Sequence, residues 1–131
     1  IEERVQVIRR RDDYERDRDG FAVEWKREES KVRNAIKRAK GALPSVEVPD
    51  AALARAAELC LALGTDGLRG ELTLIRAARA FAALTKKKKV SDVELQRVAP
   101  LALRHRLRRD PLDEAGSTVR VDRAVAEVFA P

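Results

Sequence analysis

The stretch that decides the fold is DGLRGELTLIRAARAFAAL, residues 66–84. Its apolar residues recur every three or four positions, which predicts a helix from about Leu68 to Leu84. Two glycines bracket Arg69 where this helix begins. Gly67 permits a tight turn, and Gly70 lets a neighbouring group approach the backbone closely. The sequence therefore predicts an apolar helix that presents one arginine at its N-terminus.

Three further helices are predicted around this one. The first covers residues 50–63, where an aspartate provides the N-cap and a glycine follows the last turn. The second is capped at Ser91 or the next residue, and Pro100 is expected to kink it or to end its first part. The last covers roughly residues 119–129. Four short helices with this pattern predict a small all-α bundle over residues 50–131.

Residues 1–49 differ from the bundle because apolar residues are sparse among many charges. Along 21–43 they form only a narrow stripe, which is typical of a helix that packs on one side. Gly20 interrupts the pattern, so we expect two helical pieces, with a glycine and a proline ending the second. Residues 44–49 carry a proline at each end and indicate an extended linker. The predicted organisation is a charged helical arm with its linker over 1–49, then a four-helix bundle over 50–131.

Composition limits the kinds of site that this chain can build. Charged residues make up 38% and aromatic residues 4%, which favours solvated helices over a sandwich or barrel. The formal net charge of +6 favours acidic partners such as nucleotides, nucleic acid or acidic protein surfaces. One cysteine, Cys60, excludes an intrachain disulfide, and a single histidine excludes a His-based metal site. No apolar run is long enough to span a bilayer, so we expect no membrane span.

No complete active site is visible in the sequence. There is no GxxxxGK[ST] phosphate loop, and no serine lies in a nucleophile-elbow context. We therefore assign no catalytic residue and no metal ligand. The chain begins with Ile1 inside a charged stretch, so we expect it to be a piece of a longer protein. A segment of this kind can only lend residues to a site that is built elsewhere.

Arg69 is the main candidate for a binding residue. A guanidinium at a helix N-terminus can hold two phosphate oxygens, beside backbone N–H groups that also favour anions. The alternative is that Arg69 pairs with Glu71 or another carboxylate and only closes a turn. The spacing by itself leaves both interpretations open.

Other basic residues are candidates for an interface. Arg76 and Arg79 either continue a basic stripe from Arg69 or cover the edge of the core. Lys86–Lys89 either contact phosphate or an acidic partner or form a solvated turn, and no interleaved aromatic residue supports base stacking. The end of the third bundle helix is also basic, and it either complements the helix dipole or docks on an acidic surface. Its arginines are Arg104, Arg106, Arg108 and Arg109.

Three stretches together resemble one family, the ATPase subunit I of magnesium chelatase, over nearly the whole chain. They are RVQVIRRRDDYERD at 4–17, DGLRGELTLIRAARAFAAL at 66–84 and VAPLALRHRLRRDPLDEAGSTVRV at 98–121. GLRGELT and LRHRLRRDPL are the specific parts. RAARAFAAL and APLALRHRL also resemble lids of MoxR-type AAA+ ATPases, whereas DPLDEAGS and the long charged arm favour the chelatase.

The resemblance implies an AAA+ motor subunit that assembles into rings, typically hexamers. With two other chelatase subunits it would couple ATP hydrolysis to insertion of Mg²⁺ into protoporphyrin IX, in chlorophyll or bacteriochlorophyll biosynthesis. Residues 50–131 would be the helical lid, 1–49 the connecting arm, and Arg69 the sensor-2 arginine. ATP with Mg²⁺ would be bound mainly by an N-terminal domain upstream of this chain. Nucleic acid is not an expected partner, and the location would be cytoplasmic, or the plastid stroma in a plant or alga.

Three alternatives stay open at this point. The chain is also compatible with the lid of a MoxR-like chaperone ATPase and with the ATPase subunit of a cobalt chelatase, which shares the same architecture. A third alternative, from a different class, is a basic helical module that binds nucleic acid. A strong dependence of DNA affinity on salt concentration would favour that third interpretation.

Overall fold

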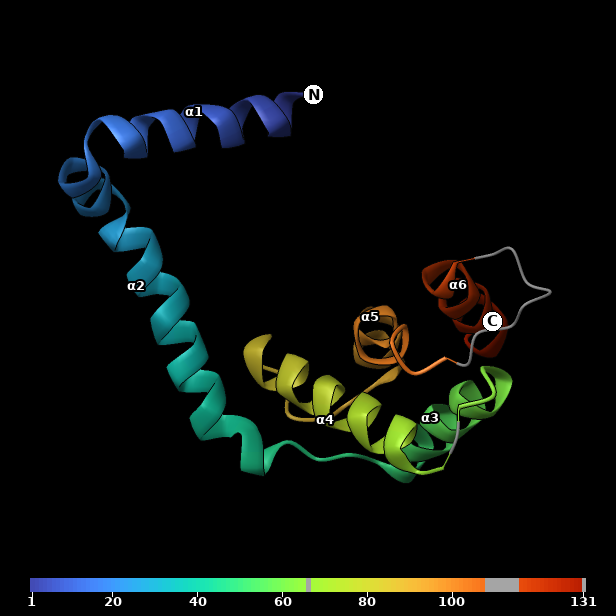
Figure 1. Cartoon of the computed structure of the whole chain (residues 1–131). Helices are drawn as coiled ribbons and strands as arrows, with labels where there is room; N and C mark the ends of the chain where they lie inside the picture. Colours follow the sequence, from blue (N-terminus) through green and yellow to red (C-terminus); the bar gives the residue numbers. More distant parts are fainter. Residues whose placement is uncertain (66, 108–115, 131) are drawn as a thin grey trace. The chain divides into compact units, whose positions relative to one another are not determined.

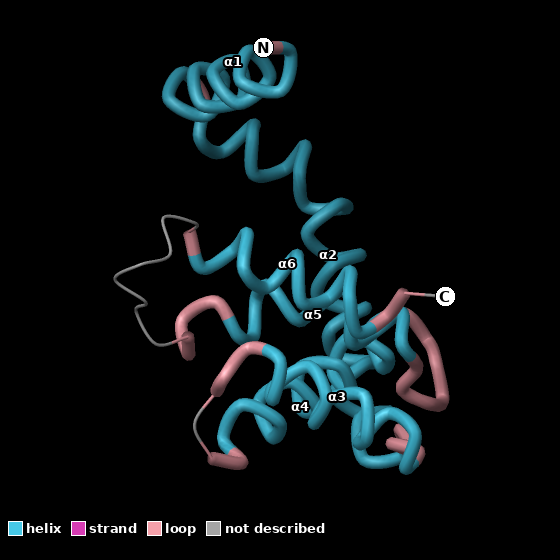
Figure 2. Tube along the Cα trace, turned by 90° about the vertical axis from the view of Figure 1, so that its right-hand side faces the viewer, coloured by secondary structure: helices cyan, strands magenta, loops and turns pink. Residues whose placement is uncertain are grey.

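The computed structural model describes residues 1–65, 67–107 and 116–130, and every regular element in these ranges is helical. The chain divides into two compact units (Figures 1 and 2). The arm unit is Ile1–Lys37, and the bundle unit is Arg38–Pro131. The predicted all-α class is confirmed. The only strand-like pairing in the described ranges is an isolated parallel bridge between Glu47 and Lys89.

The arm unit contains α1, Glu2–Arg16, and most of α2, Arg18–Ala42. The two predicted helical pieces are confirmed, but the break lies at Asp17 and not at Gly20. Asp17 leaves the helical conformation, with φ −146° and ψ 89°, and its Oδ1 accepts a hydrogen bond from the backbone N–H of Gly20 at 2.9 Å. An aspartate that caps a helix in this way starts a new helix directly, so the break precedes the glycine.

The linker region packs on the bundle, and the compact units therefore divide before Arg38, earlier than the boundary at residue 49 that the sequence predicts. After α2 the chain forms a short 3-10 helix, η1, Leu43–Ser45. Val46 then enters the core and is only 4% exposed. The backbone N–H of Glu47 donates to the carbonyl of Lys88 at 2.9 Å. Hydrogen bonds and burial thus attach this segment to the four helices that follow it.

Four helices form the bundle, and their predicted positions are confirmed to within a few residues. They are α3, Asp50–Ala62; α4, Arg69–Leu84; α5, Asp92–Leu103; and α6, Ser117–Val128. Each contacts at least two of the others. Pro100 lies inside α5, which continues to Leu103, so of the two outcomes expected at this proline the end of the helix is excluded. The carbonyl that loses its donor to Pro100 belongs to Gln96, which is exposed, so solvent can satisfy it.

The core is built from leucines and alanines. Every bundle helix contributes at least one side chain that is completely buried, and these are Leu59, Leu74, Leu95, Leu103 and Val121. Between them lie small residues such as Ala56, Ala78, Ala82 and Ala99, each at most 1% exposed. Small side chains let helix axes approach closely, which explains how a chain with so few aromatic residues excludes water from its centre.

Candidate functional site

The turn between α3 and α4 places Arg69 at the first position of α4, as predicted. Gly67 has φ +63°, a backbone conformation that glycine adopts at little cost and other residues rarely adopt. The turn therefore reverses the chain within a few residues and starts α4 at an exposed position. The exposed side chain of Arg69 thus extends from the first turn of α4, whose N–H groups have no intrahelical partner.

Gly70 fixes the start of α4 against the end of α3. A Cβ at position 70 would lie 2.9 Å from Oγ1 of Thr65 and 3.4 Å from Sγ of Cys60, so only glycine fits without a shift. The Thr65 hydroxyl is itself held, because it donates to the carbonyl of Cys60 at 3.2 Å. The predicted close approach at Gly70 is confirmed, and the approaching groups are Cys60, in the last turn of α3, and Thr65, just after that helix.

Arg69 itself is exposed, and no carboxylate in the described residues forms an ion pair with it. Its backbone carbonyl accepts a hydrogen bond from Oγ1 of Thr73 at 2.7 Å, which strengthens the first turn. Glu71, the expected alternative partner, has one carboxylate oxygen buried without a hydrogen-bond donor in the described residues. The Glu71 carboxylate is thus directed into the protein, and the geometry leaves the Arg69 guanidinium available.

The environment of Cys60 includes Thr65 and the charge of Glu71. Burial raises the pKa of the Cys60 thiol, the Thr65 hydroxyl lowers it, and the negative charge of Glu71 raises it further. The Glu71 charge therefore acts on the thiol, in agreement with the burial of one of its carboxylate oxygens. Cys60 is 1% exposed, so its thiol is buried in the core.

The neighbouring arginines of α4 occupy two different environments. Arg76 is exposed and lies seven residues after Arg69, hence on the same helix face. Arg79 is half-buried, and its Nε is buried without a hydrogen-bond partner in the described residues. Arg69 and Arg76 therefore form an exposed row, while Arg79 covers the edge of the core.

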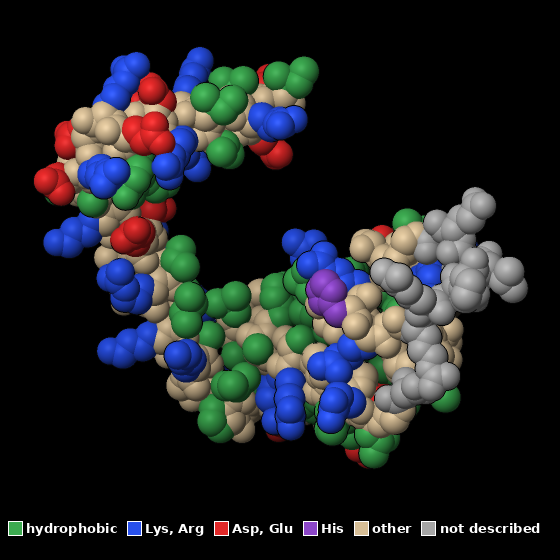
Figure 3. Space-filling model, in the orientation of Figure 1, with side chains coloured by type: hydrophobic (Ala, Val, Ile, Leu, Met, Phe, Trp, Pro, Cys, Tyr) green, Lys and Arg blue, Asp and Glu red, His purple; other side chains and the backbone are tan. Residues whose placement is uncertain are grey.

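The basic end of α5 is described only as far as residue 107. Arg104 and Arg106 are exposed, and Nε of Arg104 donates to Nε2 of His105 at 3.0 Å. Figure 3 shows several basic side chains and the histidine on the displayed face of the bundle unit. The candidates Arg108 and Arg109 lie outside the described residues.

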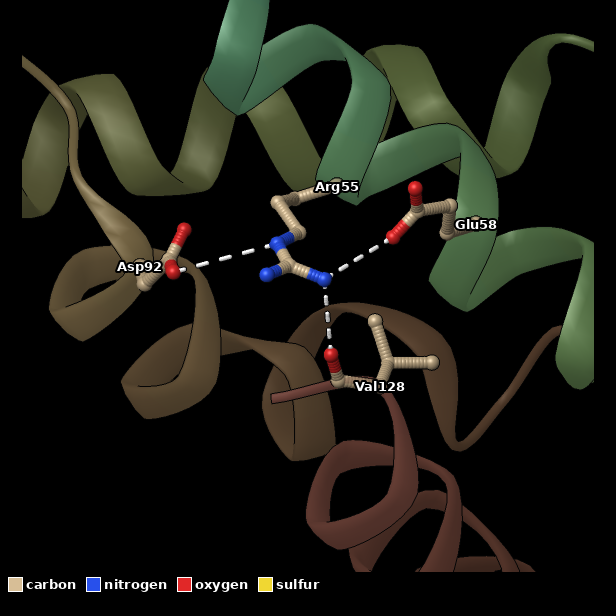
Figure 4. A network of polar contacts seen from close by, with 4 residues as sticks. All are labelled: Arg55, Glu58, Asp92 and Val128. Carbon is tan, nitrogen blue, oxygen red and sulfur yellow. Dashed lines mark hydrogen bonds and ion pairs between the residues drawn. The ribbon is translucent and has the colours of Figure 1, made fainter. Parts of the chain in front are cut away.

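Arg55 is a residue whose role the sequence did not reveal. Its Nη1 donates to Oε2 of Glu58 at 3.1 Å and to the carbonyl of Val128 at 2.9 Å, and its Nε lies 3.9 Å from Oδ2 of Asp92 (Figure 4). One side chain of α3 thus holds the start of α5 and the end of α6. The available signal was that Arg55 is the single cation in a helix whose only other charged residues are Asp50 and Glu58.

The aromatic residues of the arm pack on one another. Phe21 stacks on Trp25 with ring centroids 5.7 Å apart, and Tyr14 meets Phe21 edge-on at the same distance. The guanidinium of Arg10 lies 4.6 Å from the centre of the Trp25 ring, a cation–π contact. These contacts hold the end of α1 against the beginning of α2 within the arm unit.

The described residues contain no group of three or more His, Cys, Asp and Glu residues that could hold a metal ion. No helix among them is long and apolar enough to cross a membrane. What they offer is an exposed guanidinium at a helix N-terminus, which suits an anion such as a phosphate group.

A family model described as an AAA lid domain matches residues 53–127. This chain belongs to the AAA lid domain family. The match begins inside α3, contains all of α4 and α5, and ends within α6, so Arg69 lies within this lid domain.

Curated relatives extend the similarity beyond the lid domain. The "Magnesium-chelatase 38 kDa subunit" of Rhodobacter capsulatus is 58% identical over 129 residues, which is 98% of this chain and 37% of that protein. The subunit of the same name from Cereibacter sphaeroides is 55% identical over 98% of this chain and 39% of its own length. The "Magnesium-chelatase subunit ChlI, chloroplastic" of Nicotiana tabacum is 38% identical over 97% of this chain and 30% of its own length.

These matches confirm the resemblance to magnesium chelatase ATPase subunits, and they include the arm as well as the lid domain. The chain spans less than two fifths of the length of these three relatives, between 30% and 39%.

Proposed function

We propose that this chain is the helical lid and connecting arm of the ATPase subunit of a magnesium chelatase. That enzyme couples ATP hydrolysis to insertion of Mg²⁺ into protoporphyrin IX on the route to chlorophyll or bacteriochlorophyll. Similarity to chelatase subunits along 97–98% of the chain supports the assignment. The observation that carries the mechanism is the exposed Arg69 at the start of α4, which no carboxylate of the described residues neutralises.

In this proposal Arg69 is the sensor-2 arginine and contacts the terminal phosphate of ATP. The nucleotide and its Mg²⁺ are held mainly by a domain outside this chain, and Arg69 supplies charge-assisted hydrogen bonds to the phosphate oxygens. Hydrolysis changes the charge and position of those oxygens, so the bonds are lost and the lid is free to move. Because Gly70 packs directly on Thr65 and Cys60, a displacement of Arg69 also moves the end of α3.

Copies of the subunit are proposed to form a ring, typically a hexamer, that works with the other chelatase subunits. Exposed cations of the bundle unit are suited to contacts with a neighbouring copy or subunit, and they include Arg76, Arg104 and Arg106. Arg79, which is half-buried at the edge of the core, is proposed to belong to the same interface. The proposed location is the cytoplasm, or the plastid stroma if the source is a plant or alga.

The test is the substitution Arg69→Ala in the full-length subunit, with Arg123→Ala on the exposed face of α6 as a matched control. We expect ATP hydrolysis and chelation to fall about tenfold or more, because a bidentate phosphate contact is lost. Arg69→Lys should recover only part of the activity, since an ammonium group keeps the charge but not the planar fork.

A binding measurement separates this role from a structural one. The full-length subunit should bind a non-hydrolysable ATP analogue more tightly than ADP, and Arg69→Ala should reduce that preference while the urea unfolding midpoint stays unchanged. Full turnover by Arg69→Ala, or an unaltered preference for the triphosphate, would rule out the proposed contact.

A further inference from the structure

Five cations lie at or beside the turn that connects α4 to α5. Lys86–Lys89 are consecutive and all exposed. Arg38 joins them, because its Nη2 donates to the carbonyl of Leu84 at 2.8 Å, two residues before the first lysine. Lys89 pairs with Glu47 at 3.0 Å, and in the described residues no ion pair occupies the other three lysines. We refer to Arg38 and Lys86–Lys89 as the basic turn.

Local contacts explain the charge of Lys89, which pairs with Glu47, and in part that of Lys87, which acts on the Glu94 carboxylate, but they do not explain the charges of Lys86 and Lys88. Cations near a helix C-terminus complement the dipole, but Arg38 already binds the last carbonyl of α4. Lys86 also occupies a position that favours glycine, with φ +62°, and its N–H donates to the carbonyl of Ala83 at 3.2 Å. A lysine in this left-handed position is less stable than glycine, so its charge needs a different explanation.

The surface beside the lysines indicates the kind of partner. An open hollow of about 460 Å³ is lined by Lys87, Lys88, Lys89, Ser91, Val93 and Glu94. Val93 is 67% exposed and gives the hollow an apolar side. Its lining contains no aromatic ring on which a nucleic-acid base could stack. Ammonium groups beside an exposed valine suit a chain of carboxylates that also carries an apolar side chain.

We propose that the basic turn is a docking surface for an acidic segment of a partner protein. Each exposed ion pair contributes little, so binding depends on several lysines acting together and weakens as salt screens them. The cluster also accelerates encounter with an acidic partner, because clustered charges of one sign attract it over a distance. This surface is separate from Arg69 and does not rest on the function proposed above.

The test uses the 131-residue chain and a fluorescein-labelled peptide of glutamate and leucine, with fluorescence anisotropy as the readout. Lys87→Glu/Lys88→Glu reverses two charges and leaves the Lys86 backbone and the Lys89–Glu47 pair in place. We expect it to weaken binding about tenfold or more at about 25 mM NaCl. The matched control Lys26→Glu/Arg27→Glu changes the net charge equally on the exposed surface of the arm unit and should alter binding less than about twofold.

A second variant separates the effect of lost charge on peptide binding from any loss of stability. Lys86→Gly relieves the left-handed backbone while it removes one charge, so the chain should become more resistant to urea and yet bind the peptide more weakly. The proposal is overturned if the peptide fails to bind, or if the control loses as much affinity as Lys87→Glu/Lys88→Glu. It is also overturned if a DNA duplex binds more tightly than the peptide and responds to the same substitutions, because the surface would then recognise phosphate.

Discussion

The guanidinium of Arg55 binds the carbonyl oxygen of Val128, the last residue of α6, with an Nη1–O distance of 2.9 Å. Helix C-termini leave their final carbonyls without intrahelical partners, so a donor from another helix stabilises them. Arg55 supplies that donor from α3. Its guanidinium carbon also lies 5.9 Å from the centre of the Phe129 ring, and this cation–π contact strengthens the same junction. One side chain thus connects the first and last helices of the bundle.

Arg55→Ala should therefore destabilise the bundle. We expect a loss of about 1–2 kcal/mol in the free energy of unfolding, because a hydrogen bond from a charged donor and its packing on Phe129 are removed together. Urea unfolding followed by circular dichroism measures the change. Arg123→Ala, an exposed cation of α6, serves as the control and should shift the free energy by less than about 0.5 kcal/mol. Equal effects of the two substitutions would show that the Arg55 contacts do not contribute.

Gly70 and Gly41 should respond oppositely to alanine. A Cβ at position 70 meets Oγ1 of Thr65 at 2.9 Å, whereas one at position 41 meets nothing within 4 Å. Gly70→Ala should destabilise the bundle by about 1–3 kcal/mol because the close contact between α3 and α4 must open. Gly41→Ala should stabilise α2 by about 0.5–1 kcal/mol through helix propensity.

Thermal unfolding of the two variants in parallel measures the contrast. The double variant Gly70→Ala/Thr65→Ala should recover part of the loss, because the obstructing hydroxyl is gone. A Gly70→Ala chain as stable as the parent would show that the turn adjusts freely and that Arg69 is not fixed by this contact.

Glu94 should make the stability of α5 depend on pH. Its Oε2 accepts hydrogen bonds from the Ser91 hydroxyl at 2.6 Å and from the Ser91 backbone N–H at 2.8 Å. Burial works against the charged form, but these bonds, a further backbone bond and the charge of Lys87 together lower the pKa of Glu94 below its ordinary value of 4.5. The stabilisation is therefore complete above the ordinary pKa and is lost as the pH falls through the lower pKa of the folded state.

The substitution Glu94→Gln tests this link. At neutral pH it should cost about 1 kcal/mol, the value of a helix-capping interaction. The difference between parent and variant should shrink as the pH falls below the ordinary pKa and through the lowered pKa of the folded state, where the parent carboxyl becomes protonated. Urea unfolding over this pH range provides the measurement. A difference that stays constant with pH would mean that the charge of Glu94 plays no part.

Cys60 should be protected from alkylation in the folded chain. Its side chain is 1% exposed and burial raises the pKa of the thiol, so both access and the reactive thiolate are suppressed. Iodoacetamide should label it at least about 100-fold more slowly than in the urea-unfolded chain, at a rate set by opening of the bundle. Mass spectrometry over time measures this rate. Rapid labelling under native conditions would show that the junction of α3 and α4 opens readily.

The sequence by itself determined the all-α class, the extents of the bundle helices and the exposed place of Arg69. These features depend on local chemistry, namely helical periodicity, capping residues at helix starts and glycines in turns, and all of these can be read from neighbouring residues. The same local rules failed at one point, because Asp17 ends α1 before Gly20 is reached.

Only the tertiary structure decided which distant groups meet. It directs the Glu71 carboxylate inward, towards Cys60 and away from Arg69, and it brings Arg55 to the end of α6, 73 residues later. It also attaches Glu47 to the turn at Lys88, which makes the linker part of the bundle. Contacts of this kind depend on how helix faces pack in space, and a cation or carboxylate has the same local signature whether its partner is a neighbour, a remote carbonyl or solvent.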